Sequence, residues 1–193
     1  MRIEEASLRL PADAGRVLLP LARDAIARAL GVDSPGAAAA AWREAPGAAF
    51  VTLTTGGELR GCIGSLEAQR SLGEDVRENA VAAAFRDPRF PPLAPDEFDV
   101  VAIEVSVLSP PQPLAFASED EALAQLVPHV DGIIFEYGYH RSTFLPQVWE
   151  KIHTPREFLA HLKYKAGLPP DFWHATVRLA RYTVSKWSEA ESA

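Results

Sequence analysis

The sequence predicts an α+β protein with two subdomains, in which helices flank mainly antiparallel sheets. Two observations lead to this fold class. The expected elements follow the order helix, hairpin, helix, strand, helix, hairpin, helix, strand, and hairpins join antiparallel strands. Hydrophobic residues make up 48% of the 193 residues, which is enough for a sizeable core. We therefore expect residues 1–193 to form a single domain with two interleaved lobes.

The chain begins with a helix expected over Ala12–Leu30, where apolar residues recur at helical spacing. Pro20 lies inside this pattern and is expected to kink the helix or split it. Gly31 is a natural helix stop. The segment Gly31–Gly47 is rich in Ala, Pro and Gly, and we expect a connector there.

A hairpin follows, with its first strand expected over Phe50–Leu53. The pair Gly56-Gly57 provides a turn whose glycines are free to adopt positive φ. The segment Arg60–Cys62 returns as the second strand. Strand alternation then predicts that Arg60 and Cys62 share one face of the sheet.

A second helix is expected over Ser71–Arg86, with Ser71 as its cap and a stripe of small residues for close packing on a sheet. Asp87-Pro88 ends it, because the residue before proline avoids helical geometry. The clearest strand is Asp99–Leu108, whose second face is mixed. Glu104 on that face is expected to lie near solvent or in an ion pair.

The C-terminal half shows two capping boxes and further strand patterns. A bulge near Arg181 is expected in the last strand, because the alternation slips there. The expected elements are helices from Ser118 to about Val127 and from Thr154 to Gly167, and strands at Ile133–Tyr137, Ser142–Leu145 and Val177–Lys186.

Charge and cysteine content exclude several classes of protein. The formal net charge of −7 argues against tight binding to nucleic acid or anionic membranes, which needs a dense basic surface. No apolar run approaches the ~18 residues of a membrane span. The start Met1–Glu5 carries acidic residues and no apolar signal core. The single cysteine forms no internal disulfide, so we expect a cytoplasmic protein.

The hexapeptide Leu59–Gly64, Leu-Arg-Gly-Cys-Ile-Gly, is the most informative segment. It holds the only cysteine, Cys62, two residues from Arg60. A nearby guanidinium favours thiolate over thiol. Gly61 and Gly64 allow a ligand or another segment to approach closely, although tight packing against the alanine-rich helix explains them more simply.

This hexapeptide resembles the hallmark of the AMMECR domain family, which includes the group called AmmeMemoRadiSam system protein A. The resemblance spans about residues 48–187 and consists of blocks in the expected order. Besides the hexapeptide, these blocks are Asn79-Ala80, Asp87–Phe90, Ile103–Ser109, Thr143–Val148 and Lys165–Leu168. It implies a single AMMECR-type α+β domain of two subdomains with a cleft or surface at the hexapeptide. It implies no known reaction, and the group name links the family with Memo-type and radical-SAM proteins as partners.

Cys62 is a candidate nucleophile, redox-sensitive thiol or thiol carrier, while the structural alternative is a small buried side chain. Arg60 is a candidate for binding a carboxylate or phosphate, and its alternative is an ion pair with Glu104 or Asp87. Arg89 and Arg141 are further candidates for an anion site, as is Arg86; the alternative for these scattered charges is a solvated surface.

A cysteine enzyme also needs a base near the thiol. Among the five histidines, His140 is the best candidate because it lies in a turn beside Arg141. We expect no metal site, because the common ligand spacings are absent, and no cofactor, because no glycine-rich phosphate loop is present.

These observations favour a protein whose cleft around Arg60–Gly64 binds a small anionic ligand or a segment of a partner protein. Two alternatives stay open. One is an enzyme that uses Cys62 as nucleophile or thiol carrier, and the other is a pure interaction module. An exposed reactive thiol would distinguish the enzyme from the other two.

Overall fold

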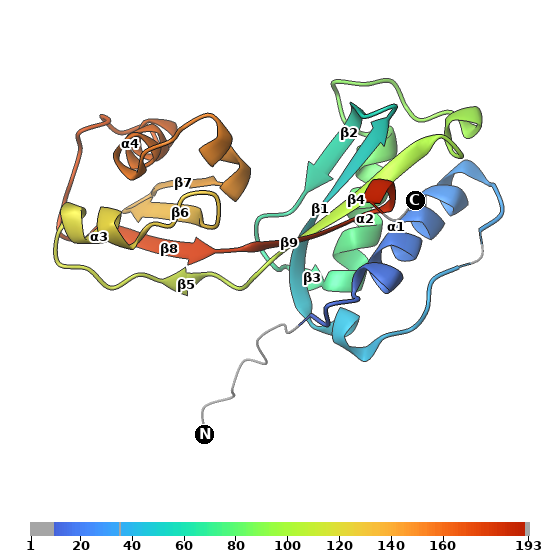
Figure 1. The fold of residues 1–193 in the computed structure, drawn as a ribbon, viewed down its shortest axis with the longest axis horizontal. Coiled ribbons are helices and arrows are strands. Elements are labelled where there is room, and N and C mark those ends of the chain that lie inside the picture. The colour runs from blue at the N-terminus through green and yellow to red at the C-terminus, as the bar shows by residue number, and fades with distance from the viewer. Residues whose placement is uncertain (1–9, 35, 192–193) are drawn as a thin grey trace. The chain divides into compact units, whose positions relative to one another are not determined.

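The computed structural model describes residues 10–34 and 36–191. Within them the chain forms four α-helices and two mainly antiparallel sheets, which confirms the predicted α+β class (Figure 1). The chain divides into two compact units: unit 1 runs to Ser109 and resumes at Ser185, and unit 2 is Pro110–Val184. The segment Met1–Glu5, in which we expect no signal sequence, lies outside the described residues.

Unit 1 is built on a five-stranded sheet in the order β2-β1-β4-β9, with β3 also pairing with β1. Its strands are β1 (Pro46–Thr55), β2 (Glu58–Gly64), β3 (Arg70–Ser71), β4 (Val101–Leu108) and β9 (Val184–Ser188). Its α-helices are α1 (Gly15–Leu30) and α2 (Leu72–Phe85), and 3-10 turns lie at Ala41–Glu44, Pro95–Glu97 and Glu189–Glu191.

Helix α1 is one continuous helix, so of the two expected effects of Pro20 the split is wrong, and the kink stays a prediction. Pro20 removes one backbone hydrogen bond, but burial of the apolar stripe, Leu18 and Ile26 among it, outweighs this local loss. Gly31 ends the helix as predicted, with a left-handed φ of 73°.

The core of unit 1 lies between one face of its sheet and both helices. Alternate residues of the central strands, such as Val51 on β1 and Ile103 on β4, are fully buried against α1 and α2. Helix α2 begins as predicted at Ser71, whose side chain accepts the Glu74 N–H in a capping box. We call the opposite side of this sheet the outer face.

Unit 2 contains a four-stranded sheet in the order β5-β8-β6-β7. Trp149 and Phe158, both fully buried, stack with ring centroids 3.9 Å apart in its core. The elements of unit 2 are β5 (Gln112–Pro113), α3 (Glu119–Gln125), β6 (Gly132–Tyr137), β7 (His140–Phe144), a 3-10 turn at Pro146–Glu150, α4 (Pro155–Lys165) and β8 (Arg178–Tyr182).

The last predicted strand, Val177–Lys186, is in fact two strands that belong to different sheets. Strand β8 pairs with β6, with Arg181 opposite Ile133 in unbroken register, and β9 then joins β4. The slip in alternation therefore marks a break at Thr183 rather than the predicted bulge near Arg181.

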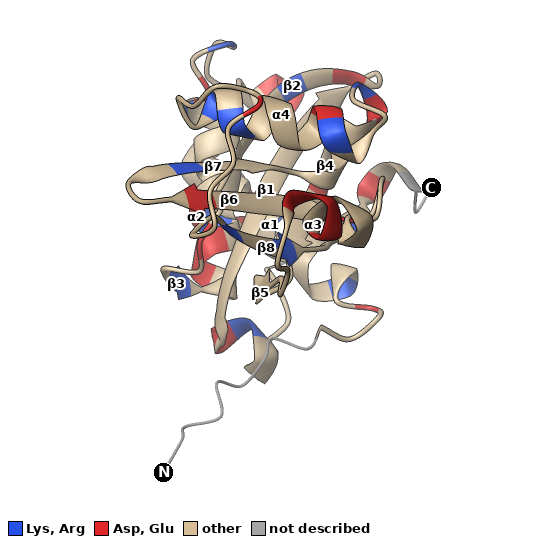
Figure 2. Ribbon diagram, turned by 90° about the vertical axis from the view of Figure 1, so that its left-hand side faces the viewer, with Lys and Arg blue, Asp and Glu red and all other residues tan. Residues whose placement is uncertain are grey.

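Charged residues of both signs occur along both units, and acidic residues gather at the start of α3 in Glu119–Glu121 (Figure 2). The prediction that the protein does not bind nucleic acid tightly stays a prediction. Within residues 10–34 and 36–191, every helix is too short or too polar to cross a membrane.

Candidate functional site

The β1–β2 hairpin presents the hexapeptide at the edge of the sheet of unit 1. Gly56 and Gly57 form its two-residue turn with φ angles of 59° and 85°, the left-handed conformation that the sequence predicts. The turn places Cys62 on β2 opposite Thr52 on β1. Because β2 is the last strand on this side of the sheet, its outward backbone groups need partners from elsewhere.

Arg60 lies at an irregularity in β2. Leu53 pairs with Gly61, but Thr54 pairs with Leu59, so Arg60 is the extra residue of a β-bulge. We predicted that Arg60 and Cys62 share a face because side chains alternate along a regular strand. The bulge interrupts this alternation, so strand alternation no longer supports the prediction. The two side chains have different partners.

Arg60 forms a bidentate ion pair with Glu97, a residue that neither alternative from the sequence named. Its Nε lies 2.7 Å from Glu97 Oε1 and its Nη2 lies 2.9 Å from Oε2, and the Arg60 side chain is only 12% exposed. Hydrogen bonds from Arg60, and then from the Ala94 N–H, lower the pKa of Glu97 to about 2. The same pairing raises the pKa of Arg60. Arg60 is therefore a structural cation that joins β2 to the segment after α2.

We expect Arg60→Ala to lower the free energy of unfolding by about 1–3 kcal/mol, because a half-buried carboxylate loses its charge-assisted hydrogen bonds. An arginine that only binds an anion in a cleft would instead leave the stability close to that of wild type. Urea unfolding at neutral pH measures the difference.

The pH dependence of this stability difference checks the role of the Arg60–Glu97 pair. A carboxyl with a lowered pKa stabilises the fold above its unfolded pKa, and Glu97 loses this contribution as the pH falls from about 4.5 to about 2. The difference between wild type and Arg60→Ala should therefore shrink over that range. Arg86→Ala is the matched control in unit 1, because its pair with Glu78 is about half exposed and should contribute under ~1 kcal/mol. Equal stability of Arg60→Ala and wild type would contradict the structural role.

The edge of β2 is covered by the segment Asp87-Pro88-Arg89. The Cys62 N–H donates to Asp87 Oδ2 at 2.9 Å, and the Cys62 carbonyl accepts from Arg89 Nη2 at 3.2 Å. Asp87 is 4% exposed and also accepts from Arg89 Nε at 2.9 Å. The Arg89 hydrogen bonds, together with the Cys62 N–H, lower the pKa of the Asp87 carboxyl, and they raise that of Arg89. This pair satisfies the outward backbone groups of Cys62.

The thiol of Cys62 lies on the outer face in a row of polar side chains. Thr52 Oγ1 donates to Cys62 Sγ at 3.3 Å, and Thr52 is paired on its other side with Glu104 of β4. Lys186 of β9 lies next, with its Nζ 3.6 Å from Glu104 Oε1. Cys62, Thr52 and Glu104 are half-buried and Lys186 is exposed. We call these four residues, one from each of four adjacent strands, the Cys62 row.

Both glycines of the hexapeptide have packing reasons. A Cβ at Gly61 would lie 2.2 Å from the Ala83 carbonyl oxygen of α2, which confirms close packing on the alanine-rich helix. A Cβ at Gly64 would lie 2.2 Å from the ring of Phe50, a neighbour on β1 rather than on the helix. Neither glycine therefore needs a ligand to explain it.

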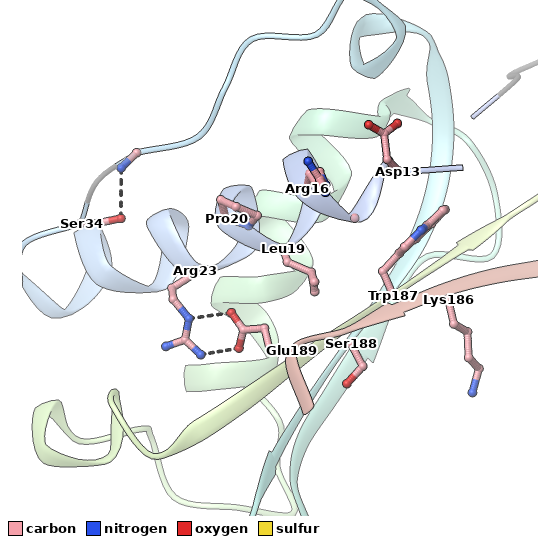
Figure 3. A pocket seen from close by; sticks show the side chains of 12 residues that line it. Asp13, Arg16, Leu19, Pro20, Arg23, Ser34, Lys186, Trp187, Ser188 and Glu189 are labelled. Carbon is pink, nitrogen blue, oxygen red and sulfur yellow. Dashed lines mark hydrogen bonds and ion pairs between the residues drawn. The ribbon is translucent and has the colours of Figure 1, made fainter. Parts of the chain in front are cut away.

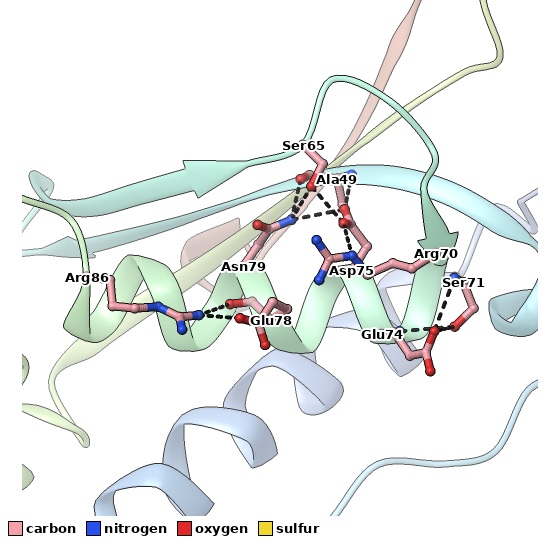
Figure 4. Close-up of polar contacts among 9 residues, drawn as sticks. All are labelled: Ala49, Ser65, Arg70, Ser71, Glu74, Asp75, Glu78, Asn79 and Arg86. Carbon is pink, nitrogen blue, oxygen red and sulfur yellow. Dashed lines mark hydrogen bonds and ion pairs between the residues drawn. The ribbon is translucent and has the colours of Figure 1, made fainter.

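A buried polar network supports the end of the hexapeptide (Figure 4). Asp75, 1% exposed, accepts from Ala49 N at 2.8 Å and from Ser65 Oγ at 2.7 Å. Asn79 donates to the same carboxylate at 2.9 Å and to Ala49 O at 3.1 Å. Arg70 Nε lies 3.3 Å from Asp75 Oδ1. The network fixes Ser65, which directly follows Gly64.

The sequence analysis does not predict this network. A signal was present. Asp75 and Asn79 lie four residues apart on the stripe that contains Val76 and Ala80, so both had to be buried. Buried polar residues at helical spacing require partners.

The other predicted site residues have partners of their own. Arg86 pairs with Glu78 in unit 1, and Arg141 pairs with Glu136 in unit 2. His140, also in unit 2, places its Nδ1 2.8 Å from the carbonyl oxygen of Ala166. A carbonyl only accepts, so Nδ1 carries the proton and a neutral His140 keeps Nε2 as its acceptor.

Among the described residues, no group of three or more His, Cys, Asp or Glu side chains has the arrangement of a metal site. The chemistry that the Cys62 row offers is that of a thiol, a hydroxyl, a carboxylate and an ammonium group. These groups can bind polar ligands, and the thiol can attack an electrophile.

Fold and site together define a class: an α+β protein of two compact units, whose edge strand carries one half-buried cysteine with its backbone capped by an Asp-Arg pair. The family model AMMECR1 matches residues 19–187, and the chain belongs to this family. The match begins earlier than the resemblance at about residue 48.

The relatives include archaeal and bacterial proteins. Protein MJ0810 of Methanocaldococcus jannaschii is 43% identical over 150 residues, which is 74% of this chain and 73% of its own. A protein of Methanothermobacter thermautotrophicus is 40% identical over 190 residues, 93% and 96% of the two chains. The crystal structure of the uncharacterised protein PH0010 from Pyrococcus horikoshii superimposes with a TM-score of 0.76 at 33% identity, and the match covers 93% of each chain.

Proposed function

We propose that the outer face of unit 1 around the Arg60–Gly64 segment is a recognition site, which binds a small anionic ligand or a segment of a partner protein through the Cys62 row. The observation that carries this proposal is the row itself. Four polar side chains stand at one level of a sheet face that neither α1 nor α2 covers. A partner of the Memo type or a radical-SAM protein fits the group name of the family, which is an association and not a mechanism.

The ion pairs in the structure change which cations we expect to bind an anion. Arg60 and Arg89, the cations that the sequence favours, each form a bidentate pair with a carboxylate. Lys186 is 53% exposed, and the one ion pair that it forms among the described residues, with Glu104, is long at 3.6 Å. Lys186 is therefore the better anion ligand.

Protection of the thiol tests this proposal directly. Cys62 is the only cysteine, so iodoacetamide labelling reports on this site alone. We expect one of phosphate, pyrophosphate or citrate to slow labelling several-fold, and we expect Lys186→Gln to remove the protection. Lys151→Gln, which changes an exposed lysine of unit 2, is the matched control and should retain it.

If no anion slows the labelling, the anionic-ligand form of the proposal is wrong. The partner form then predicts that a purified Memo-type protein from the same genome protects Cys62 and co-elutes with this chain in gel filtration. Absence of both effects would contradict the recognition site as a whole.

The second candidate function is an enzyme that uses Cys62 as nucleophile or thiol carrier. The contact that favours it is the hydrogen bond that Thr52 donates to Cys62 Sγ. A donor to sulfur stabilises the thiolate, which is the reactive form. His140 belongs to unit 2, so its role as the base for this thiol stays a prediction.

For this second candidate, we expect Thr52→Val to slow iodoacetamide labelling of Cys62 about threefold to tenfold at neutral pH, since one hydrogen bond contributes about 1 kcal/mol. Thr54→Val is the matched control, because Thr54 is a half-buried threonine two residues further along the same strand. Equal rates for both variants would reject activation of the thiol by Thr52.

A further inference from the structure

Unit 1 contains a cavity of about 590 Å³ that no sequence pattern indicated. It lies between α1 and the C-terminal strand β9 (Figure 3). Its volume falls within the range of about 300–1,000 Å³ that is typical of small-molecule sites. The residues that the argument uses are Asp13, Arg16, Leu19, Pro20, Arg23, Trp187 and Glu189.

Both ends of this cavity are fixed by contacts within unit 1. At one end Trp187 donates its indole N–H to Ala12 O at 3.2 Å, and a Cβ at Gly15 would lie 2.6 Å from the indole ring. At the other end Arg23 pairs with Glu189 and also donates to the carbonyl of Val101 at 2.7 Å. The walls are therefore formed before any ligand arrives.

The groups left for a ligand are apolar side chains and two cations, Arg16 and Lys186, since the pair of Lys186 with Glu104 is long at 3.6 Å. Leu19 and Trp187 are partly buried and, with Pro20, form an apolar lining between α1 and β9. Arg23 is already paired with Glu189. Arg16 is exposed on the same wall and, among the described residues, forms no ion pair. The lining contains three cations and two carboxylates, so it carries a positive excess.

We propose that this cavity binds a small amphipathic anion, whose aromatic or aliphatic body packs against Leu19 and Trp187 and whose anionic group pairs with Arg16. Apolar contact area provides most of the affinity of such a site, and one charged contact fixes the orientation of the ligand. Asp13, three residues before Arg16, disfavours a second anionic group.

Two fluorescent probes with the same aromatic body test the proposal. Anilinonaphthalene sulfonate carries one anionic group, and N-phenylnaphthylamine is its neutral counterpart. We expect both to bind the native full chain with one site, with Kd values below about 100 μM. The sulfonate should bind about threefold to tenfold more tightly than the neutral probe. Amide chemical shifts should change along α1 and β9.

Variants locate the site and test its charge. Arg16→Gln should remove the advantage of the sulfonate and leave the neutral probe unchanged. Arg28→Gln on the same helix is the matched control, because this arginine does not line the cavity and should alter neither probe. Leu19→Gln should weaken both probes several-fold. Arg16 is exposed, so its variant keeps the test valid even if Leu19→Gln destabilises the fold.

Three results would overturn the proposal. The first is that neither probe binds with a Kd below about 100 μM. The second is a stoichiometry well above one probe per chain. The third is that Arg16→Gln and Arg28→Gln weaken the binding of both probes to the same extent. A sulfonate advantage that survives Arg16→Gln would also overturn the assignment of Arg16. Cys62 does not line this cavity, although Lys186 does, so the cavity is tested only with Arg16→Gln and Leu19→Gln, which leave the Cys62 row intact.

Discussion

Replacing Asp75 by alanine should lower the free energy of unfolding by about 3 kcal/mol or more, because several buried groups would lose their acceptor at once. The Ala49 N–H and the Asn79 amide both donate to Asp75 Oδ2, and Ser65 donates to Oδ1. Helix α2 covers these groups, so water cannot replace the carboxylate at low cost. Urea unfolding should show a lower midpoint with an unchanged slope.

Glu78→Ala is the matched control for this change. Glu78 lies on the same helix, is exposed, and within the described part of the chain pairs with Arg86 alone (Figure 4), so its loss should stay within about 0.5 kcal/mol. The double variant Asp75→Ala, Asn79→Ala should lose less than the sum of the two single losses, since the residues share one network. Additive losses, or a loss for Asp75→Ala as small as that of the control, would argue against the network.

The same substitution connects stability with the candidate site. Ser65 directly follows Gly64, and its hydroxyl is bonded to Asp75 and Asn79. Loss of the carboxylate should therefore release the end of β2 and speed iodoacetamide labelling of Cys62. A folded Asp75→Ala protein with an unchanged labelling rate would show that the network stabilises unit 1 without positioning the hexapeptide.

Local chemistry made part of this fold predictable. The Gly56-Gly57 turn follows from the positive φ that such hairpins need, and the start of α2 follows from the Ser71 capping box. Each of these features depends on residues within four positions of one another. For that reason they can be recognised in a single sequence.

Features that depend on distant partners were not predictable in the same way. Glu97, 37 residues from Arg60, decides whether that arginine is a free anion ligand or a structural cation. The bulge at Arg60 breaks the alternation that predicted a shared face with Cys62. The division between β8 and β9 depends on which sheet each half of the segment joins. These outcomes are decided by tertiary packing, which overrides local preference.

Gly61 decides how closely β2 approaches α2. A Cβ at this position would lie 2.2 Å from the Ala83 carbonyl oxygen and 3.1 Å from its carbonyl carbon. Both atoms belong to the backbone of the last turn of α2, so neither can move without shifting the end of the helix. The glycine is therefore required by packing, and truncation of the Ala83 side chain would not relieve the clash.

Gly61→Ala should accordingly lower the free energy of unfolding by about 3 kcal/mol, at the upper end of the usual cost of overpacking. Ala83→Gly should not restore stability when combined with it. Gly73→Ala is the matched control, since the nearest atoms to a Cβ there belong to Arg43 at 3.4 Å, an ordinary contact distance, and alanine favours a helix, so this variant should be neutral or more stable. Urea unfolding of the three variants compares them. Suppose that Gly61→Ala is as stable as wild type, but that an anion no longer slows the labelling of Cys62 in this variant. The glycine then serves ligand access, and the packing argument for the hexapeptide is wrong.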